Sequence, residues 1–172
     1  MLDDADLCVE IVNAILLSQN LKSITVDGYR EKFEFPVRIY YERLGLPSSG
    51  SLFEKFSYQF IKEYHLSWKK CNLQEYAKET IAFIKSKGIE QSILSAGKQE
   101  HVEGFVDHHE LRAFFAFVSG TKDIYAAGKL ETGKLHLSKL KADPDDCLLI
   151  GDTTHDFEVA ENLGIDCLLF GG

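Results

Sequence analysis

Short apolar runs alternate with helical patterns in the second half of the chain, and this alternation restricts the fold more than any other feature. Four such runs are present, and each ends in or beside small or polar residues. They cover residues 91–94, 114–118, 147–150 and 167–170. Short buried strands separated by helices are typical of a parallel sheet covered on both faces. We therefore predict an α/β core with a doubly wound, Rossmann-like parallel sheet.

The first half has a different pattern, because its apolar residues recur at helical spacing. Leu7, Ile11 and Ile15 indicate an amphipathic helix that ends near residues 18–20, and early aspartates favour its N-terminal end. Three further stripes are predicted to be helical, with Gly88 capping the last. They span residues 37–44, 53–64 and 73–84. The sequence thus predicts an inserted α-helical cap at 18–85 and a discontinuous core at 1–17 and 86–172.

Composition narrows the classes of function. A net charge of −8 and a pI near 5.2 disfavour nucleic acid as a partner. The aspartates near the N-terminus do not fit a signal peptide, and no apolar run approaches the roughly 20 residues that span a bilayer. Cys8, Cys71, Cys147 and Cys167 are too dispersed for a zinc site or disulfide framework. We expect a cytoplasmic protein without a membrane partner, and its oligomeric state stays open.

Polar residues follow the predicted strands at one edge of the sheet, where ligands bind in folds of this kind. Ser95 and Asp152 each follow an apolar run, Asp156 lies one helical turn after Asp152, and Lys129 precedes a predicted helix. Carboxylates suit Mg²⁺, a hydroxyl beside free backbone amides suits phosphate oxygens, and lysine adds positive charge. Together these residues predict a site for a phosphate group and a metal ion.

Each of these residues also has a simple structural interpretation. Ser95 alone is more often a helix N-cap, and Lys129 alone is more often a solvated lysine. Asp152 could be a turn residue, and Asp156 could be a carboxylate of the first helical turn. The combination at one edge of the sheet is what favours the functional interpretation.

The residues resemble the haloacid dehalogenase-like (HAD) hydrolase superfamily. ILSAG at 93–97 is similar to its second motif, Lys129 to its third, and LLIGDTTHDFEVAENLG at 148–164 to its fourth. Lys134 competes with Lys129 for the third motif. The segments LCVEIVNAILLSQNL and FPVRIYYERLGLP resemble the phosphoglycolate phosphatase-like branch, which carries a helical cap after its first helix.

The resemblance implies a role for each matched residue. Ser95, Ala96, Gly97 and Lys129 would bind phosphate, with Ser95 and Lys129 taking part in catalysis. Asp152 and Asp156 would hold Mg²⁺ or orient its ligands. The activity implied is hydrolysis of a small phosphorylated metabolite through a phospho-aspartyl intermediate.

One family motif has no counterpart in this chain. Members begin with a central strand that ends in DxDGT and carries the nucleophilic aspartate, whereas this sequence opens with Met1-Leu2-Asp3-Asp4. Asp4 and Asp6 have the DxD spacing but are interpreted as charges at the start of a helix. We expect the nucleophile upstream of this sequence, and the chain by itself to be inactive or to receive the strand from a partner or a rearrangement.

Two other functions are compatible with a doubly wound fold. A catalytically silent phosphate- and Mg-binding module, or a subunit that needs a partner strand, is the alternative. A dinucleotide-binding domain is disfavoured because no GxGxxG follows any predicted strand.

Overall fold

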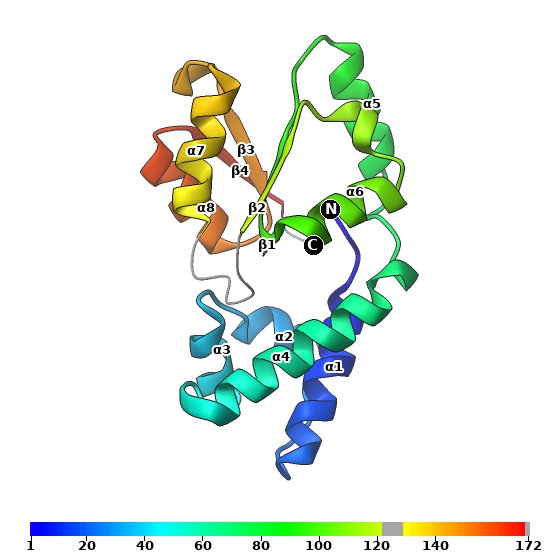
Figure 1. Ribbon diagram of the computed structural model, residues 1–172, viewed down its shortest axis with the longest axis vertical. Coiled ribbons are helices and arrows are strands. Elements are labelled where there is room, and N and C mark those ends of the chain that lie inside the picture. Colours follow the sequence, from blue (N-terminus) through cyan, green and yellow to red (C-terminus); the bar gives the residue numbers. More distant parts are fainter. Residues whose placement is uncertain (122–128, 171–172) are drawn as a thin grey trace.

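The computed structural model describes residues 1–121 and 129–170. Figure 1 shows two groups of elements, a helical group formed by α1 to α4 and an α/β body formed by the remaining elements. None of the helices in the described ranges is long and apolar enough to cross a membrane.

The helical group is held together by one apolar core. Its members are α1 (Ala5–Ser18), α2 (Val26–Lys32), α3 (Val37–Arg43) and α4 (Gly50–Ser67). Ile15 and Leu16 of α1 are fully buried against Tyr40 and Tyr41 of α3 and Phe56 of α4. The predicted first helix is confirmed, including its end at Ser18. The division of the chain into core and cap at residue 17 stays a prediction, and in the structure α1 packs against α2 and α4.

The segment that leaves the helical group differs from the prediction. The third stripe was expected to be helical from residue 73, but α5 spans only Ala77–Ser86. Leu73 instead forms an antiparallel bridge with Leu2, and the amide of Asp3 donates to the carbonyl of Asn72. The short helix η1 (Trp68–Lys70) precedes this segment. The N-terminal residues that lead into α1 and the segment that follows α4 therefore lie side by side.

The α/β body alternates strands with helices, as predicted. Its elements are β1 (Ile93–Lys98), α6 (Gln99–His108), η2 (Arg112–Phe114), β2 (Val118–Thr121), α7 (Leu130–Leu140), η3 (Pro144–Asp146), β3 (Leu148–Gly151), α8 (Thr154–Leu163) and β4 (Asp166–Leu169). The prediction for 114–118 was wrong at its start, because the amide of Phe114 donates to the carbonyl of Leu111 in a tight turn and the strand begins only at Val118.

The α/β fold with parallel strands is confirmed, but the described strands form two separate pairs. β1 pairs with β2 and β3 pairs with β4, both in parallel. Helix α6 packs on the β1–β2 pair, α8 packs on the β3–β4 pair, and α7 contacts β1, β2 and α8. A cavity of about 130 Å³ lies between β1, β3 and α7, and its lining includes Leu94, Ile150 and His136. We call the space between β1 and β3 the strand gap.

Gly120 in β2 permits a close approach between β2 and the start of α6. A Cβ atom at this position would lie 2.6 Å from the carbonyl oxygen of Gly97 and 2.7 Å from Cα of Gln99. The amide of Gly120 also donates to the side-chain oxygen of Gln99. Backbone atoms cannot rotate away, so any side chain here must displace β2 from α6.

We predict that Gly120→Ala lowers the free energy of unfolding by about 1–3 kcal/mol through overpacking. Gly104→Ala is the matched control, because its Cβ meets only Trp68 at an ordinary 3.9 Å. Alanine inside α6 should raise stability by about 0.5–1 kcal/mol. Urea denaturation followed by circular dichroism measures both. Equal effects of the two substitutions would contradict this account of Gly120.

Candidate phosphate and metal site

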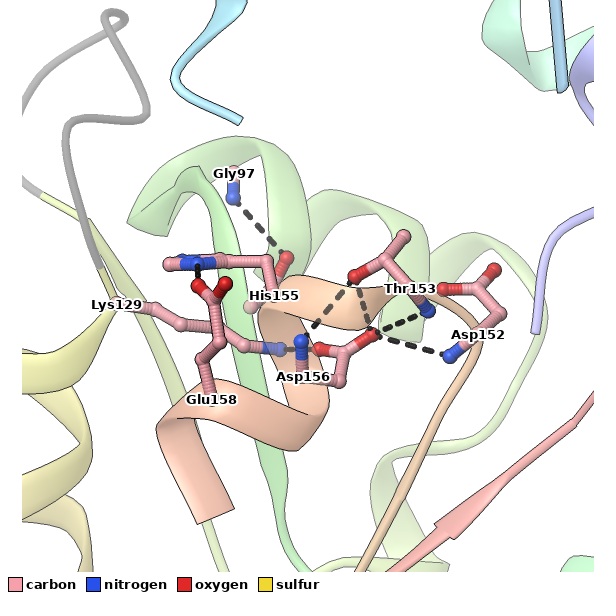
Figure 2. A network of polar contacts seen from close by, with 8 residues as sticks. Gly97, Lys129, Asp152, Thr153, His155, Asp156 and Glu158 are labelled. Atoms are coloured by element: carbon pink, nitrogen blue, oxygen red, sulfur yellow. Dashed lines mark hydrogen bonds and ion pairs between the residues drawn. The ribbon is translucent and has the colours of Figure 1, made fainter. Parts of the chain in front are cut away.

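The turn between β3 and α8 is ordered by a reciprocal set of hydrogen bonds. Thr153 is the N-cap of α8, and its hydroxyl oxygen accepts from the amide of Asp156 at 3.3 Å. The Oδ2 atom of Asp156 accepts in return from the amides of Asp152 and Thr153, both at 3.0 Å, and from the Thr153 hydroxyl at 2.8 Å. Figure 2 shows these bonds converging on one carboxylate oxygen. This capping box holds the residues after β3 in one conformation.

The other oxygen of Asp156 is paired with Lys129. Lys129 lies directly before α7, and its ammonium group forms a buried ion pair with Oδ1 of Asp156. Only 9% of the Lys129 side chain and 7% of the Asp156 side chain are exposed. Burial acts to raise the pKa of Asp156, but the hydrogen bond and charge of Lys129, helped by Thr153 and the amide of Asp152, hold that pKa below its usual range. Lys129 is therefore not a solvated surface lysine.

Lys134, the competing lysine, lies in a different environment. It is exposed on α7 and pairs at 2.7 Å with Glu131, three residues earlier on the same helix.

Gly151 allows Asp156 to pack against the end of β3. A Cβ atom on Gly151 would overlap with Cβ and Cγ of Asp156. The glycine of the GDxxxD pattern is therefore needed for the side-chain position of the aspartate five residues later.

Ser95, Ala96 and Gly97 form the end of β1 that faces this turn. The Ser95 hydroxyl accepts from the amide of Gly97 at 3.1 Å, and the carbonyl of Ala96 accepts from the hydroxyl of Thr121 at 3.1 Å. The N-cap interpretation of Ser95 is wrong, because β1 continues to Lys98, which is the N-cap residue of α6. Gly97 is exposed, so a ligand can reach this segment.

Asp152 and Asp156 are not equivalent as metal ligands. Both oxygens of Asp156 are already engaged by protein donors, whereas the carboxylate of Asp152 points away from Lys129 in Figure 2. Among the described residues, no group of three or more histidine, cysteine or acidic side chains is arranged to hold a metal. Mg²⁺ commonly binds through one or two carboxylates together with phosphate and water. The residues fit a Mg²⁺ ion bound by Asp152, with Asp156 in an orienting role.

Two contacts near the site were not predicted from the sequence. His155 packs on Phe35, from the segment between α2 and α3, with ring centroids 5.3 Å apart. Asp4 was predicted to act as a charge at the helix start, but its carboxylate makes no capping bond and instead accepts a hydrogen bond from Tyr64 of α4. Burial raises the pKa of Asp4. Long-range contacts of this kind leave no periodic signal in a sequence.

Comparison with known proteins identifies the protein family of this chain. The model of the haloacid dehalogenase-like hydrolase family matches residues 1–170, so the chain belongs to this family. No curated protein matches.

Solved structures share the fold. A predicted phosphatase from Clostridium acetobutylicum is 13% identical to this chain, with a TM-score of 0.80. The match covers 97% of this chain and 78% of the Clostridium chain. A haloacid dehalogenase-like family hydrolase from Streptococcus pneumoniae is 16% identical to this chain, with a TM-score of 0.80. The match covers 96% of this chain and 78% of the Streptococcus chain. A predicted phosphoglycolate phosphatase from Haemophilus somnus is 15% identical to this chain, with a TM-score of 0.75. The match covers 99% of this chain and 80% of the Haemophilus chain.

We predict that Lys129→Met lowers the free energy of unfolding by about 3–5 kcal/mol at pH 7, because it leaves a buried carboxylate without its partner. Lys134→Met is the control, and loss of its exposed pair should cost less than about 1 kcal/mol. Urea denaturation measures both. A similar loss of unfolding free energy in the two variants would show that the buried Lys129–Asp156 pair contributes no more to stability than an exposed pair.

The lowered pKa of Asp156 also predicts a pH dependence. The ionised form stabilises the folded state, so its contribution is fully present above the usual value near 3.8 and is lost as pH falls through the folded-state pKa. The difference in unfolding free energy between the wild type and Asp156→Asn should be constant from pH 8 to about 5 and shrink below that range. A difference that grows on acidification would contradict this assignment.

Proposed function

We propose that this site hydrolyses phosphomonoesters of small metabolites in a Mg²⁺-dependent reaction. The observation that carries the proposal is the buried Lys129–Asp156 pair beside the turn that presents Asp152. A buried lysine ammonium that is held in place by one carboxylate can also attract a phosphate oxygen. The exposed end of β1 offers a hydroxyl and backbone groups to the same anion.

Ser95, Ala96, Gly97 and Lys129 bind the phosphoryl group in this proposal. The Ser95 hydroxyl already accepts from the Gly97 amide and can donate its own proton to a phosphate oxygen. Lys129 supplies positive charge against the phosphoryl oxygens, and Asp156 keeps its ammonium in position. Lys129 is preferred to Lys134 because Lys134 lies exposed and paired with Glu131 on the face of α7.

Asp152 would hold the metal ion. A bound Mg²⁺ would offset negative charge on the phosphoryl group in the transition state. The capping box fixes the backbone of Asp152 through its amide, so its carboxylate starts from a defined position.

The nucleophile is proposed to be an aspartate on a strand that fills the strand gap. Its carboxylate oxygen would attack phosphorus as the P–O ester bond breaks and the leaving oxygen takes a proton from solvent or a neighbouring acid. Water would then attack the acyl phosphate and release phosphate and the free carboxylate. The strand gap supports this position, because its cavity is lined by Lys129 as well as by Leu94 and Ile150. A carboxylate at the end of such a strand would face the phosphate group.

The helical group is proposed to act as the cap that selects the substrate. Phe35 contacts His155 beside the site, so the segment between α2 and α3 lies where a leaving group would project. Phosphoglycolate is a substrate suggested by the related branch of the family. A cytoplasmic location fits a metabolite phosphatase.

Two measurements test the proposal, one for binding and one for turnover. Titration calorimetry with inorganic phosphate in the presence of Mg²⁺ should show saturable binding that Lys129→Met weakens at least about tenfold. In a protein extended by the strand that carries the nucleophile, Mg²⁺-dependent hydrolysis of an aryl phosphate should fall at least about 100-fold in Asp152→Asn. Asp145→Asn, an exposed acidic residue in η3, is the matched control. Absence of phosphate binding would refute the site.

A second candidate function follows from the strand gap. The chain would then be a phosphate- and Mg-binding subunit that a partner strand completes. Unpaired N–H and C=O groups on two strand edges are costly when sealed from water, and β1 and β3 each pair on one side only among the described strands. In the protein extended by the missing strand, phosphate binding without turnover would favour this candidate, whereas turnover that Asp152→Asn abolishes would favour the enzyme.

A further inference from the structure

Four histidines gather where the helical group meets the α/β body on the side of α6. His65 lies near the end of α4, and His101, His108 and His109 lie on α6. Four of the six histidines in the chain are therefore at one junction. We call these residues the histidine cluster. Figure 1 shows the end of α4 approaching α6 at this point.

The cluster surrounds an aromatic contact that joins the two groups. Trp68 of η1 is 4% exposed and packs against Phe105, with ring centroids 6.2 Å apart. His108 meets the edge of Trp68 at 5.2 Å, and His109 lies 4.8 Å from Phe105. The indole N–H of Trp68 and Nε2 of His109 are buried and have no hydrogen-bond partner among the described residues. The junction is therefore held by ring packing, and these two nitrogens contribute no hydrogen bond to it among the described residues.

His65 and His101 form the direct contact between α4 and α6. Their rings are stacked with centroids 4.2 Å apart and planes inclined by 28°. Stacking is favourable between neutral imidazoles, whereas two imidazolium ions at this distance repel each other. His65 is exposed, so protons reach the pair from solvent.

Neighbouring charges do little to compensate protonation. Glu100 is the nearest acid to His101, but it is already paired with Lys98 at 2.5 Å. Lys69 lies over the ring of Trp68. Lys78 faces His109 and pairs with Glu110 at 3.6 Å. Glu100 and Glu110 each have a lysine partner, Asp107 pairs with Arg112, and Glu103 accepts a hydrogen bond from Gln99, so the acids on and beside α6 are already engaged.

We propose that the histidine cluster is a proton-operated latch that closes the helical group onto α6 when neutral and loosens it when protonated. The consequence for the site is direct, because α6 begins at Gln99, immediately after the phosphate-binding end of β1. Release at this junction would leave the segment around Leu73, bridged to Leu2, as the covalent link between the two groups. The latch is a property of the packing and does not depend on phosphatase activity.

The direction of the pH response follows from the ring environments. Burial lowers the pKa of His101, and the charges of His65 and Lys98 lower it further against the opposing effect of Glu100. Burial, with His108 and Lys78, also lowers the pKa of His109. Both pKa values lie below the usual 6.5 in the closed state, so the closed state loses stability as pH falls below about 6.5.

Tryptophan fluorescence tests the latch, because Trp68 is the only tryptophan in the chain. Between pH 8 and 5.5 the wild type should show a reversible red shift of emission while far-UV circular dichroism stays unchanged. His65→Phe keeps a stacked ring that cannot be protonated, and it should flatten the transition. His101→Phe should act in the same way and replaces His65→Phe if that variant does not fold.

A control separates opening from simple quenching by His108, which touches Trp68. His108→Gln should change the intensity but keep the red shift, since the His65–His101 pair is intact. The radius of gyration from small-angle scattering should rise on acidification in the wild type and in His108→Gln, but not in His65→Phe. A wild type without a transition, or a transition of equal size in His65→Phe, would overturn the proposal.

Discussion

The buried ion pair between Lys129 and Asp156 is the interaction on which the rest of the site depends. It joins the residue before α7 to the first turn of α8, so two helices on different strand pairs share one electrostatic contact. The other oxygen of Asp156 holds the backbone of Asp152 and Thr153. Removal of either charge leaves its partner buried alone, which costs far more than the net worth of an exposed pair. Stability and the proposed phosphate binding thus depend on the same residues.

The helical group contacts the α/β body both beside this site and at a distance from it. It meets the α/β body at the Phe35–His155 contact beside the turn after β3 and at the histidine cluster around Trp68. The segment around Leu73 connects the groups covalently, and Leu2 forms a bridge with it. The first contact lies where substrate would be selected, and the second lies where protonation would alter closure.

Local patterns in the sequence were sufficient for most elements. The Gly-Asp-Thr segment and the periodic residues after it predicted β3 and α8 closely, because strand, cap and helix signals there agree. Leu73 and Phe114 were assigned wrongly because a bridge to Leu2 and a turn to Leu111 outweighed their local preference. The pairing of Lys129 with Asp156, and the overlap that excludes a side chain at Gly151, arise from residues far apart or packed in three dimensions. Residue spacing alone does not predict these contacts. The roles assigned to the site residues remain a prediction.

A backbone amide NMR titration with inorganic phosphate in the presence of Mg²⁺ tests the central claim most directly. If the Lys129–Asp156 pair organises one phosphate and metal site, the amides of Gly97, Asp152 and Thr153 should shift together with a single saturation curve. The curve should be lost in Lys129→Met. A surface pocket lined by Lys134, Lys141 and Asn162 offers the competing location. Shifts confined to that pocket, or no shifts at Gly97 and Asp152, would contradict the account.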